Sequence, residues 1–200
     1  MFKRSIDIRR VTVAAWLLPS GLRFLARING RLRGLWIKVR LGADGASVGK
    51  RLSACRGVQI VTVPGAKWHI GDRVGLGAGV ILSVSSGATL NIGDDVRIMH
   101  YTLIGAEQSI SIEHRAQIAE HCSIRDHDHD VAALSMHAAS PVCSPVVIGR
   151  DSWIGCGVAV LRGSCIGSGA VIGANAVVRG EIPQNAVAVG IPARVTRMRQ

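Results

Sequence analysis

The sequence predicts an all-β fold, a parallel β-helix whose coils stack along one axis. Three observations lead to this prediction: aliphatic side chains recur at every sixth residue, glycine accounts for 24 of 200 residues, and aromatic residues make up only 4%. A chain rich in glycine and poor in rings turns often and packs small side chains. The hydrophobic content of 48% excludes an intrinsically disordered chain.

The N-terminal segment, residues 1–40, holds ten Lys and Arg residues against one acid, so most of the net charge of +11 lies there. Between Pro19 and Arg40, apolar residues recur at intervals of three and four with arginines between them, which predicts an amphipathic basic helix. These apolar residues are Leu22, Leu25, Ile28, Leu32, Leu35 and Ile37. The preceding apolar run, Val11–Leu18, is too short to cross a bilayer.

This helix has two interpretations that are compatible with each other. It could dock on an anionic membrane surface, or it could cover the open end of the β-helix, where a strand edge would otherwise stay unpaired. Nucleic-acid binding is disfavoured because no nucleic-acid-binding motif accompanies the charge. We assign residues 1–56 to this segment and the first irregular turns, and residues 57–200 to the β-helix domain with its C-terminal tail.

The six-residue repeat is most regular after residue 147. Aliphatic residues at Ile148, Ile154, Val160, Ile166, Ile172 and Val178 are followed, four places on, by the small residues Ser152, Val158, Ser164, Ala170 and Ala176. Three earlier blocks keep the same spacing: Ile70, Leu76, Leu82; Ile92, Ile98, Ile104; and Ile112, Ile118, Ile124.

A period of six fits neither a simple helix nor a simple strand. We interpret each hexapeptide as one short strand and one turn, with the aliphatic side chain pointing inward, so that three hexapeptides complete a triangular coil of 18 residues. The earlier blocks are offset by ten and eight residues, which predicts an irregular corner at each junction.

The repeat is absent between residues 125 and 147, which predicts a loop that protrudes from the coils. The loop begins with Asp126-His127-Asp128-His129-Asp130. Strand alternation would place the two histidines on one face, and loops that interrupt a rigid scaffold often carry sites. Three interpretations stay open: a general base, a metal site built on the HxH spacing, or a solvated acidic turn.

The cysteine pattern favours reduced thiols in a cytosolic protein. The five residues, an odd number without a CxxC pair, are Cys55, Cys122, Cys143, Cys156 and Cys165. No cleavable signal pattern is evident either. We therefore expect them to act as small hydrophobic side chains.

The segment SPVVIGRDSWIG, followed by IGANAVV, EIP and VGIPAR, resembles the hexapeptide-repeat acyltransferases, in particular the sugar O-acetyltransferase branch with the maltose, galactoside and colanic-acid-type enzymes. The resemblance covers residues 58–198. It implies a left-handed β-helix, acetyl-CoA as acyl donor, no metal, and a homotrimer with the 125–147 loop in a cleft between subunits.

The resemblance also suggests roles for individual residues. It places the catalytic base on His129, with His127 as the alternative, and chemistry suggests Asp126 as the group that orients the imidazole. It implies acceptor contacts at His100, Tyr101 and Glu107, where the usual amide and aspartate of the family are not matched. The implied donor groove is lined by Trp153, Cys156, Ala174, Arg179, Arg194 and Arg197, the last two near the adenosine 3′-phosphate.

We therefore expect a cytoplasmic O-acetyltransferase that acts on a sugar hydroxyl of a polysaccharide, O-antigen unit or glycoside. Residues 1–40 would bring it to the inner face of the membrane. Two alternatives stay open: an N-acetyltransferase acting on an amino-sugar nucleotide, and a non-catalytic β-helix scaffold with a membrane-binding basic segment.

Overall fold

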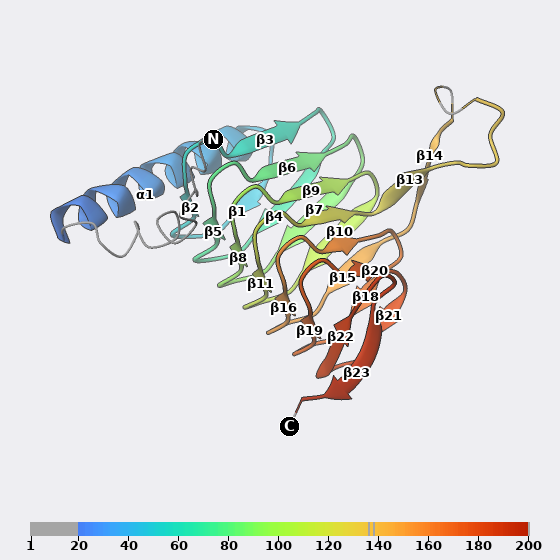
Figure 1. The fold of residues 1–200 in the computed structure, drawn as a ribbon. Coiled ribbons are helices and arrows are strands. Elements are labelled where there is room, and N and C mark those ends of the chain that lie inside the picture. The colour runs from blue at the N-terminus through green and yellow to red at the C-terminus, as the bar shows by residue number, and fades with distance from the viewer. Residues whose placement is uncertain (1–19, 136, 138, 200) are drawn as a thin grey trace, which may run out of the picture.

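The computed structural model describes residues 20–135, 137 and 139–199 (Figure 1). One helix, α1 (Ser20–Ala43), lies at one end of a stack of coils, and strand β23 (Arg194–Met198) lies at the other. The predicted basic helix is confirmed. Residues 1–19, including the apolar run Val11–Leu18, lie outside the described residues.

The coils form three sheets, which we name A, B and C. Sheet A is parallel and contains β1 (Ser47–Val48), β4 (Lys67–Ile70), β7 (Thr89–Ile92), β10 (Ser109–Ile112), β15 (Val146–Ile148), β18 (Cys165–Ile166) and β21 (Glu181–Ile182). Sheet C is also parallel and contains β3 (Gln59–Thr62), β6 (Ile81–Val84), β9 (Leu103–Ala106), β12 (Ser123–Arg125), β17 (Ala159–Val160) and β20 (Val177–Val178).

Sheet B contains β2 (Ser53–Ala54), β5 (Gly75–Leu76), β8 (Arg97–Ile98), β11 (Gln117–Ile118), β16 (Trp153–Ile154), β19 (Val171–Ile172) and β22 (Ala186–Val189), and ends with β23, which pairs antiparallel to β22. The chain visits sheets A, B and C in turn, so each coil has an A–B edge, a B–C edge and a C–A edge. The predicted all-β parallel β-helix is confirmed. Its first strands, β1 and β2, already belong to sheets A and B before residue 57.

The core includes all of the residues that the repeat singles out, together with other buried side chains such as Trp68, Leu90 and Ile110. All of the six-spaced aliphatic residues from Ile70 to Val178 are buried, none of them more than 3% exposed, and the five small residues that follow the later ones are buried as well. A single coil could not enclose this interior, so each coil depends on its neighbours. The sequence pattern therefore predicted the inner face of the β-helix correctly.

The predicted length of 18 residues per coil is correct only for the C-terminal coils. Val147 pairs with Cys165, 18 residues later, whereas Ser47 pairs with His69 and His69 with Asn91, a step of 22 residues. In the longer coils the strands of sheets A and C have four residues instead of two. The repeat therefore slips at the C–A edge, which explains the offset between the blocks.

The predicted loop begins as a hairpin that projects from the coils (Figure 1). Strands β13 (His127–His129) and β14 (Pro141–Cys143) pair antiparallel, with His127 opposite Cys143. In the described part of the chain, no helix is both long and apolar enough to cross a membrane. All five cysteines are free thiols.

Candidate active site

A buried carboxylate marks the C–A edge where the hairpin leaves the coils. Asp126 follows β12 directly and is 0% exposed. Its Oδ1 accepts the N–H of Glu107 at 2.8 Å, and its Oδ2 accepts the N–H groups of Gln108 and Ser109 at 2.8 and 2.6 Å. The first two amides belong to the turn between β9 and β10 in the preceding coil, and the third to the first residue of β10. The bonds satisfy a buried charge and fix the carboxylate in place.

The imidazole of His127 lies against this carboxylate. Its Nδ1 is 3.1 Å from Oδ1 of Asp126, and the side chain is 21% exposed. A carboxylate accepts hydrogen bonds, so Nδ1 carries the proton and Nε2 of the neutral ring keeps a free lone pair. The edge of the ring faces Gly105 on β9, where an added Cβ would lie 3.6 Å from Cε1. The pair is thus a partly buried base oriented by a buried carboxylate.

Glu107, one of the predicted acceptor-binding residues, lies at the same edge. Its backbone N–H binds Asp126, and its Oε1 accepts the hydroxyl of Ser85 at 2.7 Å. Ser85 comes from the coil before, at the same edge. Ser85 was not among the predicted site residues, although it precedes Glu107 by the 22 residues that make up one of the longer coils.

A cysteine that the sequence analysis treated only as a small hydrophobic residue also borders the site. Cys143 on β14 pairs with His127 across the hairpin. Burial raises the pKa of the Cys143 thiol, and the negative charges of Asp126 and Glu107 raise it further. The thiol therefore stays protonated at neutral pH, which makes it a poor nucleophile.

The structure separates the two histidines that the sequence analysis paired. His129 is exposed near the end of β13, and its ring makes no hydrogen bond to the described residues. Asp128 between them is exposed and accepts Nε of Arg162 at 2.8 Å. Only His127 lies beside a buried acid, so the structure brings Asp126 and His127 together and leaves His129 outside the pair.

The other two predicted acceptor residues lie at the opposite edge of sheet C. Tyr101 precedes β9 at the B–C edge and stacks on His121 with ring centroids 5.4 Å apart. Nδ1 of His100 accepts the N–H of Ala78 at 2.8 Å. Thr102 and the four residues of β9 separate Tyr101 from Glu107, and β9 alone spans roughly 13 Å of extended chain. One chain therefore does not bring the three predicted acceptor residues together.

The predicted donor residues are divided in the same way. Trp153 on sheet B is 55% exposed, and Cys156 and Ala174 follow at the B–C edge in successive coils. Arg179, in contrast, follows β20 at the C–A edge, on the side of His127. Arg194 and Arg197 are both exposed on β23, at the far end of sheet B.

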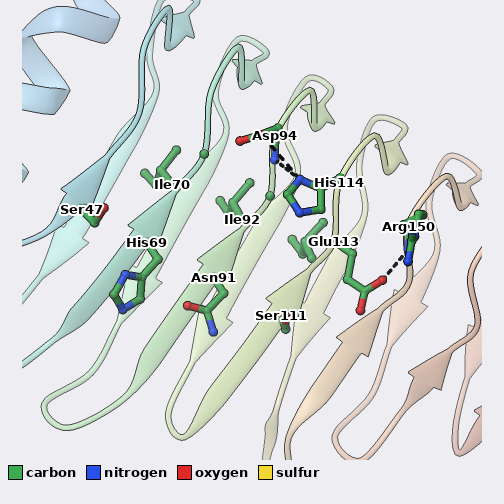
Figure 2. Close-up of a pocket in the computed structure, with 13 residues that line it drawn as sticks. Ser47, His69, Ile70, Asn91, Ile92, Asp94, Ser111, Glu113, His114 and Arg150 are labelled. Atoms are coloured by element: carbon green, nitrogen blue, oxygen red, sulfur yellow. Dashed lines mark hydrogen bonds and ion pairs between the residues drawn. The ribbon is translucent and has the colours of Figure 1, made fainter.

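A groove of about 520 Å³ follows sheet A on a different side of the molecule (Figure 2). Its outer wall carries the stacked polar residues Ser47, His69, Asn91 and Ser111. Nδ1 of His114 accepts the N–H of Asp94 at 2.9 Å, and Glu113 accepts the N–H of Arg150. These bonds join successive coils at the A–B edge. No buried acid orients a histidine in this groove.

The imidazole of His127, held by the buried carboxylate of Asp126, can accept a proton at Nε2. The C–A edge can therefore perform proton transfer. Among the described residues, no group of three or more His, Cys, Asp and Glu side chains converges as metal ligands would.

Comparison with known proteins agrees with the fold. Residues 145–180 match the family model described as bacterial transferase hexapeptide (six repeats). WbbJ of Escherichia coli, whose name describes an O-acetyl transferase of lipopolysaccharide biosynthesis, is 35% identical over 138 residues, which are 64% of this chain and 70% of WbbJ.

Two further proteins extend the comparison. A protein of Mycobacterium tuberculosis whose name describes an acetyltransferase is 40% identical over 148 residues, or 72% of this chain; the match spans about half, 49%, of that relative's length. The structure of AntD, an N-acyltransferase from Bacillus cereus in complex with dTDP and coenzyme A, superposes with a TM-score of 0.69. It covers 82% of this chain and 89% of AntD at 22% identity, and so supports the fold alone.

The expected resemblance is thus confirmed on three grounds: the buried six-residue repeat, the match of residues 145–180 to the hexapeptide family model, and the 35% identity to WbbJ. The chain belongs to the hexapeptide-repeat acetyltransferase family.

Proposed function

We propose that the protein is an acetyl-CoA-dependent O-acetyltransferase and that His127 is its general base. The observation that carries this proposal is the contact between Nδ1 of His127 and the buried carboxylate of Asp126. A sugar hydroxyl is too weakly acidic to attack a thioester unaided, and an oriented neutral imidazole supplies the missing base. The resemblance in sequence favoured His129 as the general base, whereas the buried carboxylate of Asp126 favours His127.

The reaction is a direct transfer from thioester to hydroxyl. Nε2 of His127 takes the proton as the sugar oxygen attacks the acetyl carbonyl carbon. The tetrahedral intermediate then collapses, the C–S bond breaks, and the imidazolium returns the proton to the departing thiolate of coenzyme A. Asp126 stabilises the imidazolium while it exists, because its charge lies 3.1 Å from the ring.

The enzyme is proposed to act as a homotrimer whose active sites each use two chains. His127, Glu107 and Arg179 lie at the C–A edge, whereas Tyr101, Cys156 and Ala174 lie at the B–C edge. Packing the C–A edge of one subunit against the B–C edge of the next would unite them in a cleft. The backbone N–H of Cys156, which donates to no acceptor in the described chain, would then be a candidate for the oxyanion hole.

The proposed acceptor is a sugar hydroxyl of a polysaccharide or O-antigen unit, following the function in the name of WbbJ. The carboxylate of Glu107, held by Ser85, would accept hydrogen bonds from sugar hydroxyls. The free cysteines fit a reducing cytoplasmic location.

Thiol release from acetyl-CoA in the presence of different acceptors tests this function. Release that depends on a neutral sugar, nucleotide sugar or lipid-linked saccharide, with an O-acetyl ester as product, is the expected result. Release only with amino-sugar nucleotides would replace O-transfer with N-transfer. No release with any acceptor, together with no thermal shift on adding coenzyme A, would favour a non-catalytic scaffold.

A further inference from the structure

Helix α1 has two apolar faces, and only one of them packs against the described residues of the coils. Gly30, Gly34, Ile37 and Leu41 are buried against the first coil. A side chain at Gly34 would overlap the carbonyl of Leu52, so the helix approaches the coil closely because this residue is glycine. This face caps the end of the β-helix, as one of the two interpretations of the sequence expected.

The opposite face of the helix is apolar and exposed. Its side chains are 39–65% exposed and follow the spacing of a single helical stripe: Ile28, Leu32, Leu35, Trp36 and Val39. We call these five residues the apolar stripe. Capping the coils does not explain them, because they point away from the packed face.

Basic residues border the apolar stripe on both sides. Arg31 and Lys38 lie between the stripe and the packed face on one side, and Arg33 and Arg40 on the other. Arg40 lies over the ring of Trp36, with Cζ 5.6 Å from the ring centroid. The sequence of α1 contains no acid.

A groove beside the helix extends this positive border onto the first coil. It has a volume of about 280 Å³, and the four basic residues among its lining are Arg31, Lys38, Lys50 and Arg51. Lys38 donates to the carbonyl of Gly49 at 3.1 Å. The side chains of Arg31, Lys50 and Arg51 pair with no acid in the described chain. The groove therefore offers unpaired cations next to an apolar surface.

We propose that α1 binds flat on an anionic phospholipid bilayer, with the apolar stripe at the boundary between headgroups and acyl chains and lipid phosphates in the groove of Arg31, Lys50 and Arg51. A bilayer surface presents a negative layer directly above an apolar one, which matches this arrangement. A second copy of the helix would bring its cations against those of the first. Nucleic acid would leave the apolar stripe exposed to water.

Flotation of the full-length protein with vesicles tests the proposal. We expect binding to vesicles that contain phosphatidylglycerol and much weaker binding to phosphatidylcholine alone. The double variant Lys50→Gln/Arg51→Gln should lower the partition coefficient about thirtyfold, since each cation near such a surface contributes about a fivefold change. Leu35→Ser/Val39→Ser should lower it about tenfold or more by loss of apolar contact.

Matched controls lie far from the helix. Arg125→Gln/Arg150→Gln removes two other exposed cations, and Val195→Ser/Met198→Ser removes two exposed apolar side chains at the far end of the β-helix. Both should bind vesicles like the parent protein. Equal binding of the parent to both kinds of vesicle, no binding to either, or equal losses in the controls would overturn the proposal. A change in the oligomeric mass of Leu35→Ser/Val39→Ser without a change in vesicle binding would assign the stripe to a second copy instead.

Discussion

Asp126 has no exposed surface, yet it sits where the chain leaves the regular coils. Its oxygens accept three backbone N–H groups of the preceding coil and also lie against Nδ1 of His127. The same side chain therefore holds two coils in register and orients the proposed base. The carboxylate of Asp126 therefore contributes both to the packing of the coils and to the orientation of His127. A substitution of Asp126 should affect both stability and activity.

Replacing this carboxylate by an amide should weaken both stability and activity. Asp126→Asn keeps the size of the side chain but turns one acceptor oxygen into a donor that faces backbone N–H groups. We expect the free energy of unfolding to fall by about 1–3 kcal/mol, measured by denaturant titration, and kcat to fall as well. The control Asp128→Asn, at the exposed ion pair with Arg162, should change stability by less than about 1 kcal/mol. Equal stability losses in the two variants would contradict the structural role of Asp126.

Cys143 allows a direct test of whether an acyl-enzyme forms. Because burial and two neighbouring carboxylates raise the pKa of its thiol above the usual 9.0, little thiolate exists at pH 8. We expect iodoacetamide to modify the exposed Cys55, Cys156 and Cys165 first, as read by mass spectrometry. Cys143→Ala should keep activity within a few-fold of the parent. A complete loss of activity, with the melting temperature unchanged, would point to a covalent thioester intermediate and sink the direct-transfer mechanism.

At the scale of elements, ion pairs between arginines and aspartates connect successive coils along one edge of the β-helix. Along the A–B edge, Arg73 donates two hydrogen bonds to Asp95, and Arg115 does the same to Asp151. The hydrogen bonds from these arginines hold the pKa values of Asp95 and Asp151 below the usual 3.8. Each pair joins one coil to the next on the exposed surface.

These pairs predict a modest dependence of stability on acid. A carboxyl whose pKa is lowered by folding adds stability above its unfolded pKa of 3.8, and that contribution disappears as the pH falls through the lower folded value. Asp95→Asn/Asp151→Asn should therefore melt below the parent at pH 7, and the difference should shrink as the pH falls below 3.8. High salt at pH 7 should shrink the difference, because the pairs are exposed. A difference that persists in acid would show that the charges are not its cause.

The sequence predicted the inner face of the coils but not the details of their edges. The repeat identified one buried residue in each sheet of each coil, because the side chain that points inward there is aliphatic in successive coils. The offsets of ten and eight residues between the blocks predicted irregular corners, but they could not show that the extra residues lengthen the strands on both sides of the C–A edge to four residues. The sequence also could not distinguish His127 from His129, because strand alternation puts both side chains on one face. What distinguishes them is the contact of His127 with Asp126, which is held in place by a turn from another coil.

At the scale of the whole molecule, the proposed functional residues lie at two edges of one β-helix. His127 and Glu107 lie at one edge of sheet C, and Cys156 and Ala174 at the other. If each active site uses one edge from each of two subunits, variants damaged at different edges can complement each other. Mixing His127→Ala with Ala174→Trp, after joint unfolding and refolding, should restore about a quarter of parental activity, because random trimers leave about one site in four intact. Activity no higher than that of the separate variants would place the whole site within one chain.

The most direct test of the account compares turnover of His127→Ala and His129→Ala with acetyl-CoA and the acceptor found by thiol release. The two residues lie on the same short strand, so they are matched in position and differ in contact with Asp126. If His127 is the general base, we expect His127→Ala to keep its melting temperature and to lose about a hundredfold or more in kcat. The kcat of His129→Ala should stay within a few-fold of the parent value. The reverse order, with His129→Ala inactive and His127→Ala active, would contradict it.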